Sequence, residues 1–106
     1  MPDTPRDHGP QPLDQLLTHW GLTNHQLVAA SSEQLNHKQV QRARTGRQLT
    51  LHLMQKVMRT LNAAITAKLA QEDRGKFLPY AHKCLFNYAK GYDSTWTDPN
   101  EPLMPQ

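Results

Sequence analysis

Residues 36–46 constrain the fold most strongly, because they combine helix start and stop signals with very few apolar side chains. The segment reads NHKQVQRARTG, in which Asn36 is a favoured helix N-cap and Gly46 a favoured C-terminal stop. Only Val40 and Ala43 are apolar, and helical spacing places them on one edge. The pattern therefore predicts a short helix that packs through one narrow edge and exposes its other side chains.

Apolar residues at helical spacing on both sides of this segment predict an all-α domain. A first helix is expected over residues 13–20, with Gly21 as its stop, and a second helix after the cap residue Thr23. Leu35 is an isolated apolar residue that we expect to fill the core. Thr50 is expected to cap a longer helix, whose apolar stripe consists of Met54, Val57, Met58, Leu61 and Ile65.

The chain length fits one domain, which we expect to be a compact bundle of about five helices. Residues 1–12 are rich in proline and are expected to form a flexible arm, and residues 13–70 to form the helical core. Within residues 71–92 a charged break is expected to precede a C-terminal helix over residues 78–90. Residues 93–106 contain further prolines and are predicted to be a loose tail.

Charge is distributed unevenly along the chain, whose formal net charge is +3. Residues 34–71 contain no acidic side chain, and the acidic residues lie before or after this block. A block of one sign with acidic flanks is typical of a surface that contacts phosphates, although a solvated basic helix surface is the alternative. The basic residues of the block are Lys38, Arg42, Arg44, Arg47, Lys56, Arg59 and Lys68.

Residues 21–28, with the sequence GLTNHQLV, and residues 36–46 together resemble the helix-turn-helix of the phage Cro and repressor type, also called XRE-type. Asn36 matches the family's cap, Val40 its inward β-branched residue and Gly46 its terminal glycine. The resemblance covers about residues 13–65 and implies a repressor-like regulator of transcription, from a phage or prophage, that binds specific double-stranded DNA sequences. The connection at residues 31–35 is about two residues longer than the usual turn, which leaves the depth of insertion open.

The resemblance implies two sets of DNA contacts. His37, Lys38 and Arg42 correspond to positions that read base edges in the major groove, and Gln41 lies beside them, within reach of base or backbone. For His37 and Gln41 the alternative is that they only solvate a surface helix. Contacts to the DNA backbone are expected from Thr23, Asn24, Asn36, Arg44, Arg47 and Gln48.

Proteins of this family commonly bind as dimers, and an added C-terminal helix often forms the dimer. We therefore expect a homodimer through residues 77–96, which hold most of the aromatic side chains. Exposure of Phe86, Tyr92 and Trp96 would make an adhesive patch there. The alternative is that the fifth helix only covers the core.

The sequence gives little support for metal binding, catalysis or cofactor binding. The six histidines show no metal-ligand spacing, and Cys84 is expected to be a structural cysteine. We find no phosphate-binding glycine loop, no serine elbow and no sign of a ligand pocket, so neither an enzyme nor a cofactor is expected. The absence of a long apolar run argues against a membrane span. The single cysteine is compatible with a reducing cytosol, and we expect a cytoplasmic protein.

Two other functions remain open. An antitoxin-type regulator would bind DNA and also grip a protein partner through the ends of the chain, at residues 1–12 and 93–106. A protein-interaction module that has lost DNA binding would show weak affinity for DNA without regard to sequence.

Overall fold

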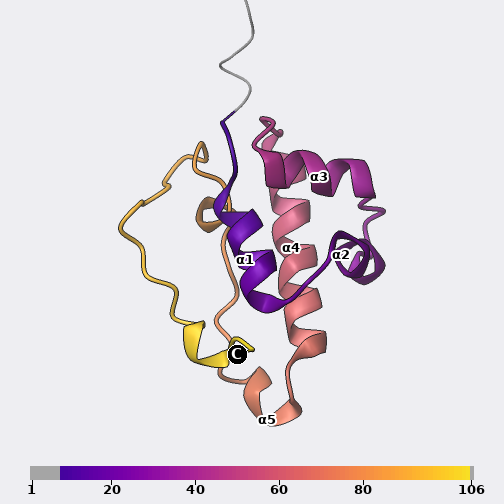
Figure 1. The fold of residues 1–106 in the computed structure, drawn as a ribbon, viewed down its shortest axis with the longest axis vertical. Helices are drawn as coiled ribbons and strands as arrows, with labels where there is room; N and C mark the ends of the chain where they lie inside the picture. The colour runs from indigo at the N-terminus through magenta and orange to yellow at the C-terminus, as the bar shows by residue number, and fades with distance from the viewer. Residues whose placement is uncertain (1–7, 106) are drawn as a thin grey trace, which may run out of the picture.

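A computed structural model describes residues 8–105, which form an all-α fold (Figure 1). The helices are α1 (Pro12–Trp20), α2 (Asn24–Ala30), α3 (His37–Thr45), α4 (Leu51–Lys68) and the single-turn α5 (Gln71–Arg74). Two short 3-10 helices follow, η2 (His82–Cys84) and η3 (Glu101–Leu103). No β-strand occurs between residues 8 and 105. The prediction of an all-α bundle of about five helices is confirmed.

The helices α2, α3 and α4 begin at the predicted cap residues. Thr23 Oγ1 accepts a hydrogen bond from the backbone N of Gln26 at 3.1 Å, and Gln26 Oε1 accepts one from the backbone N of Thr23 at 2.8 Å. Asn36 and Gln39 form the same reciprocal pair. Thr50 accepts from the third residue of α4. These bonds satisfy backbone N–H groups that a helix start leaves unpaired, so local sequence determines where each helix begins.

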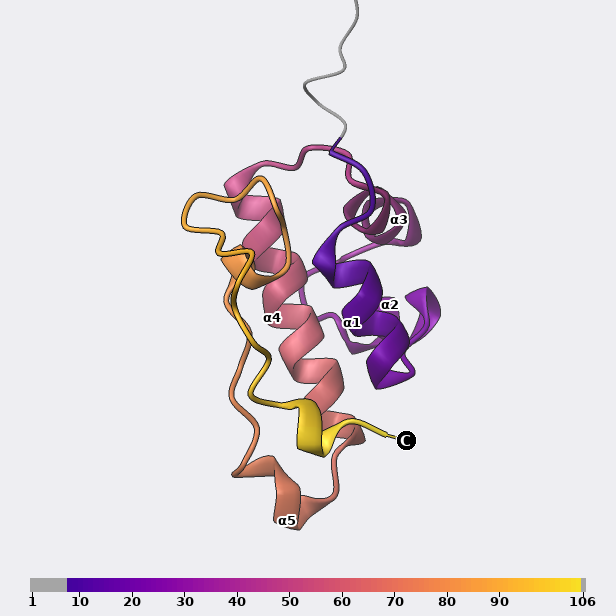
Figure 2. The ribbon, with the colours of Figure 1, turned by 60° about the vertical axis from the view of Figure 1, so that its left-hand side comes forward.

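The long helix α4 packs against α1, α2 and α3 and against residues 77–105, which we call the C-terminal segment. Figure 2 shows α1, α2 and α3 on one side of α4 and the orange part of the C-terminal segment on its other side, while η3 crosses in front of the lower end of α4. The predicted stripe of α4 is buried, except that Met58 is only partly so, and Leu35 fills the core as predicted. Side chains that are fully buried around α4 include Leu13 and Leu17 of α1, Leu27 of α2 and Val40 of α3.

The predicted helix over residues 78–90 is wrong. The fifth helix is α5, within the stretch expected to be a charged break, and only η2 interrupts the irregular backbone of residues 77–90. Leu78, at the start of that predicted helix, is 56% exposed, whereas Phe86, expected in an exposed patch, is fully buried. The apolar side chains of this segment therefore enter the core at a spacing that no helix provides.

Long-range hydrogen bonds from asparagine side chains explain the irregular backbone. Asn62 of α4 donates to the carbonyl of Tyr80 at 3.0 Å and accepts from its N–H at 2.8 Å. Asn100 pairs in the same manner with both backbone groups of Leu78, at 2.8 and 2.9 Å. These amides pair the carbonyls of Leu78 and Tyr80, which would otherwise accept hydrogen bonds within a helix over residues 78–90, so residues 78–80 need no helical partners.

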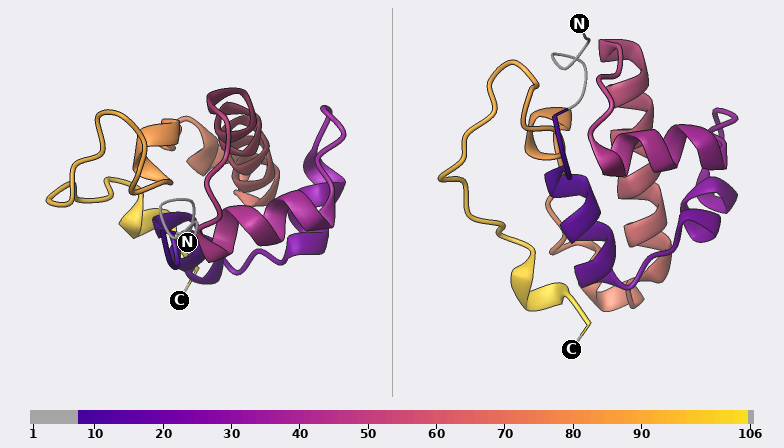
Figure 3. Two further views of the ribbon diagram at one scale, coloured as in Figure 1. Left: turned by 90° about the horizontal axis from the view of Figure 1, so that it is seen from above. Right: turned by 45° about the horizontal axis from the view of Figure 1, so that its top comes forward.

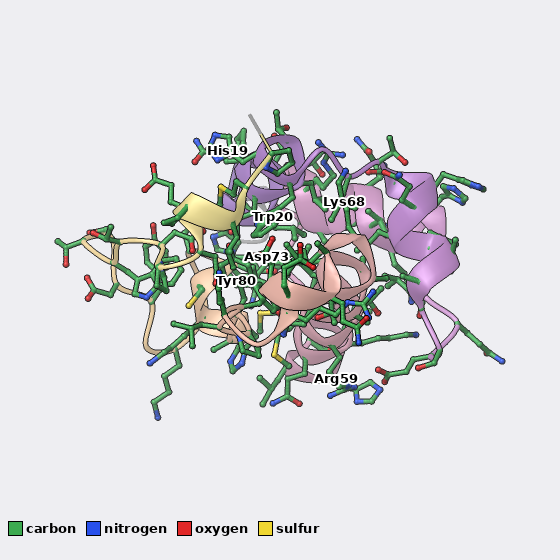
Figure 4. All side chains as sticks on the ribbon, turned by 90° about the horizontal axis from the view of Figure 1, so that it is seen from below. His19, Trp20, Arg59, Lys68, Asp73 and Tyr80 are labelled. Atoms are coloured by element: carbon green, nitrogen blue, oxygen red, sulfur yellow. The ribbon has the colours of Figure 1, made fainter. Side chains whose placement is uncertain are left out.

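The C-terminal segment is also fixed through Tyr80, which lies with Trp20 near the middle of the molecule in Figure 4. Trp20 Nε1 donates to the Tyr80 hydroxyl at 3.1 Å, and that hydroxyl donates to Asp98 Oδ2 at 2.6 Å. Burial, and secondarily the bond to Asp98, raise the pKa of Tyr80, so the phenol remains a donor. Since Asn100 is also 1% exposed, the part of the tail around residues 98–100 is packed rather than loose.

The predicted flexible arm is packed where the structure describes it, at residues 8–12, and the rest of that prediction lies outside the described residues. The backbone N of His8 donates to the carbonyl of Gly46 at 2.8 Å, and the imidazole of His8 stacks on Tyr88. Gln11 is 1% exposed and accepts a hydrogen bond from the backbone N of Asn87 at 2.7 Å. The beginning of the described chain therefore links α3 to the C-terminal segment.

Candidate nucleic-acid interface

The outer face of α3 consists of polar and basic side chains. Val40 and Ala43 are fully buried, as predicted, and they fix which face of α3 points outward. In Figures 1 and 3, α3 runs crosswise to α4 at one end of the molecule. Because residues four apart share a helix face, the exposed side chains form one surface, consisting of His37, Lys38, Gln41, Arg42 and Thr45. We call this surface the α3 face.

The structure brings together all four side chains predicted to read bases, since His37, Lys38, Gln41 and Arg42 lie on the α3 face. Neither Lys38 nor Arg42 has an ion-pair or side-chain hydrogen-bond partner among residues 8–105. Neither α2 nor α3 contains an acidic residue. The α3 face therefore offers uncompensated positive charge, which favours an anionic partner.

Acidic neighbours neutralise the charge of two other basic residues between residues 34 and 71. Arg44 Nε lies 2.6 Å from Asp14 Oδ1 of α1, and the Arg44 side chain is only 22% exposed. Arg59 of α4 pairs with both carboxylate oxygens of Glu33, at 2.6 and 2.8 Å. The predicted role of Arg44 in flanking the DNA therefore competes with an internal ion pair, which links α3 to α1.

The connection between α2 and α3 is an ordered turn. Ser31 Oγ accepts hydrogen bonds from the backbone N atoms of Glu33 and Leu35, at 3.0 and 3.1 Å. Gln34 has a φ of 62°, in the left-handed region, and directly precedes the buried Leu35. The hydrogen bond from Arg59 lowers the pKa of Glu33 below its usual value, so the carboxylate stays charged at neutral pH. The extended turn is thus fixed to α4 and sets the position of α3.

The residues predicted to contact the DNA backbone surround the α3 face. The side-chain oxygens of Thr23 and Asn36 cap α2 and α3, although both residues remain exposed. Arg47 and Gln48 follow α3 and are exposed, and the Gln48 Oε1 atom lies 3.3 Å from His8 Nε2. Asn24 is half-buried, and its side chain forms hydrogen bonds with those of Arg44 and Gln41.

Several structural features were not apparent from the sequence. His25 of α2 lies beside His37, with ring centroids 6.0 Å apart, so α2 also contributes to the surface around the α3 face. Asp14 and Glu33 flank the basic block in sequence, but only the packing of helices selects their arginine partners. A groove of about 830 Å³ lies between α1 and residues 91–105, which corrects the expectation of no pocket. Tyr92 and Trp96 are among its lining residues.

Neither a metal site nor a membrane span occurs among the described residues. Between residues 8 and 105, no three histidine, cysteine or acidic side chains gather closely enough to hold a metal ion. No helix in the described part of the chain has the length and apolarity to cross a membrane. Cys84 is a half-buried free thiol.

The fold and the α3 face define a small all-α domain that presents a short helix with an acid-free, basic outer surface. Comparison with known proteins finds no family model, curated protein or solved structure that matches the chain. The resemblance to the Cro and repressor family therefore rests on the residues of α2 and α3 alone.

Proposed function

We propose that this protein is a transcriptional regulator that binds specific double-stranded DNA sequences by inserting α3 into the major groove. The observation that supports the proposal most strongly is the α3 face, on which Lys38 and Arg42 have no ion-pair or side-chain hydrogen-bond partner among residues 8–105. An arginine that has no internal ion pair can donate two hydrogen bonds to guanine, and a lysine can reach guanine or a phosphate.

The way in which α3 is held by the rest of the domain also supports this function. Base reading requires a helix that keeps its register, because a small rotation would move side chains away from the base edges. Two buried apolar residues, the ion pair to α1 and the turn fixed to α4 restrain α3. In the helix-turn-helix arrangement, α2 would lie across the DNA backbone, and the N–H groups at its start favour phosphate.

Selection of bound duplexes from a random pool tests the proposed function. We expect enrichment of one short sequence, arranged as two inverted half-sites if the protein binds as a homodimer. Equal recovery of all sequences would overturn the proposal and favour a protein-interaction module that has lost sequence-specific DNA binding.

Replacement of Arg42 tests which side chain reads a base. We expect Arg42→Ala to weaken binding to the selected duplex by about 1–3 kcal/mol, or roughly 5- to 150-fold, and to relax the preference at one base pair. Arg47→Ala should instead weaken binding to all duplexes alike and reduce the salt slope by about 1. Fluorescence anisotropy at several salt concentrations measures both effects.

Lys76→Ala is the matched control, because it removes the same charge from an exposed position after α5, outside the segment expected to form the homodimer. It should change affinity much less than Arg42→Ala and leave the base preference unchanged. If Arg42→Ala and Lys76→Ala behave alike, α3 does not read the DNA.

A further inference from the structure

Four side chains from three helices form a continuous hydrogen-bonded chain that ends on the α3 face. Arg44 Nε donates to Asp14 Oδ1 at 2.6 Å, and Arg44 Nη1 donates to Asn24 Oδ1 at 2.7 Å. Asn24 Nδ2 in turn donates to Gln41 Oε1 at 3.2 Å. The helices α1, α2 and α3 adjoin one another on the same side of α4 (Figure 2), so each supplies part of this chain. We call it the Asp14–Gln41 relay.

The direction of the relay follows from the chemistry of its members. A guanidinium has only donors, so Asn24 must turn its carbonyl oxygen toward Arg44. The amide nitrogen of Asn24 then faces Gln41, which must turn its own carbonyl oxygen toward α2. The two N–H groups of Gln41 Nε2 are thereby left for the outside, because no described residue accepts from them.

We propose that Asn24 determines the base preference of the protein by holding Gln41 as a hydrogen-bond donor, so that Gln41 selects guanine. The inference rests on the proposed function, because it assigns one contact within the same major-groove interface. Guanine presents two acceptors there, N7 and O6, whereas adenine presents the acceptor N7 and the donor N6. A freely rotating glutamine can match adenine with both of its groups. The relay removes that option, because it directs Gln41 Oε1 toward Asn24.

A purely stabilising role for the same hydrogen bonds predicts a different effect of changes in Asn24. If the relay served only to hold α1, α2 and α3 together, changes in Asn24 would alter stability and overall affinity. They would not exchange one preferred base for another. Base preference at the position read by Gln41 is therefore the decisive measurement.

The Asn24→Asp variant reverses the relay while preserving its ion pair. A carboxylate has only acceptors when ionised, so it can accept from Arg44 and also from Gln41 Nε2. Gln41 Oε1 would then face outward and accept from the exocyclic amino group of adenine or cytosine. Residue 24 is the first residue of α2, where a negative charge favours the helix, so the variant is expected to fold.

The experiment is selection from a random duplex pool with the wild type and with Gln41→Ala, Asn24→Asp and Asp14→Asn. Gln41→Ala identifies the position that Gln41 reads, because the preference for guanine there should disappear. Asn24→Asp should shift that position from guanine toward adenine or cytosine, by roughly tenfold in relative recovery. Asp14→Asn is the matched control, since the asparagine oxygen still accepts from Arg44 and the relay keeps its direction. It should retain guanine.

Each outcome separates the inference from the function on which it depends. If the wild type enriches no sequence, both the proposed function and the relay are overturned. If a sequence is enriched but Gln41→Ala changes no position, or Asn24→Asp retains guanine, only the relay is overturned. If Asp14→Asn also shifts this position away from guanine, the proposed role of Asn24 is contradicted. The base preference would then depend on how the helices pack and not on the direction of the hydrogen bonds.

Discussion

Gly46 occupies a backbone conformation and a space that a larger residue cannot share. It ends α3 with a φ of 100°, in the left-handed region, and its N–H bonds to the carbonyl of Arg42 at 3.2 Å. A Cβ atom at this position would also overlap the backbone of Gly9, which lies directly against it. The residue therefore serves as the predicted helix stop and also allows the N-terminal segment to approach α3.

Replacement of Gly46 should consequently destabilise the domain. We expect Gly46→Ala to reduce the free energy of unfolding by about 1–3 kcal/mol, from the left-handed conformation and the displaced backbone of Gly9. Gly75→Ala is the control, because Gly75 has a φ of −71° and open space around it. That change should be neutral or stabilising by about 0.4–1 kcal/mol. Urea denaturation followed by circular dichroism compares the two, and equal stabilities would contradict the argument.

Individual residues were predictable where local rules decide their role. The caps Thr23 and Asn36 and the inward residue Val40 followed from helix geometry and are confirmed. The contacts of Arg44 with Asp14 and of Gly46 with Gly9 were not predictable, because they join segments that only the folded chain brings together. The composition of the α3 face was therefore available from the sequence, but the relay behind it was not.

At the scale of elements, the turn between α2 and α3 depends on the ion pair of Glu33 with Arg59. Arg59 lowers the pKa of Glu33 below 4.5, chiefly by hydrogen bonding, and Lys56 and His52 contribute smaller charge effects. A carboxyl whose pKa is lower in the folded state stabilises the fold above its unfolded pKa. This stabilisation is lost as the pH falls through the folded pKa. The turn should thus weaken in acid.

The pH dependence can be measured directly with Glu33→Gln. The wild type should be more stable than this variant at neutral pH, and the difference should shrink as the pH falls below 4.5. Denaturation at a series of pH values measures the difference, and a carbon-detected NMR titration should give a pKa below 4.5 for Glu33. Glu72→Gln is the matched control, because Glu72 lies in the exposed first turn of α5 and has no ion-pair partner among residues 8–105. A stability difference that is constant with pH would contradict the predicted role of the ion pair.

The elements divide into those that local signals determine and those that long-range contacts determine. The starts of α2, α3 and α4 follow their caps, and α1 follows its apolar spacing, so these were predicted closely. Residues 78–90 contain apolar residues about as densely as these helices do, but they do not form the expected helix. Their backbone partners include the side chains of Asn62 and Asn100, and that pairing depends on the whole fold. Periodicity alone could not reveal it.

At the scale of the whole molecule, the α3 face and residues 91–105 lie apart. Figure 1 shows α3 on one side and residues 85–105 along the opposite side, beyond α1. Phe86 is buried, so the predicted aromatic patch is reduced to Tyr92 and Trp96, which are 38% and 42% exposed. A second copy that contacts these two side chains would leave both α3 faces open. This arrangement suits two half-sites on one DNA duplex.

A homodimer formed through this patch, as the sequence predicts, should depend on Trp96. Truncation of a tryptophan at the centre of an interface commonly costs at least about 2 kcal/mol, so Trp96→Ala should raise the dimer dissociation constant roughly 30-fold or more. Leu51→Ala is the matched control, because Leu51 is 54% exposed at the start of α4, outside the C-terminal segment. Analytical ultracentrifugation measures both variants against the wild type.

Trp96 also makes an edge-on contact with Tyr80, so its loss could disturb the fold as well as the interface. Tyr92→Ser provides a second test, since Tyr92 lines the same groove and is exposed. It should weaken the dimer while leaving the thermal unfolding of the monomer nearly unchanged. Weakening by Leu51→Ala instead would move the interface to α4. A wild type that sediments as a monomer at tens of micromolar, with and without DNA, would contradict the homodimer itself.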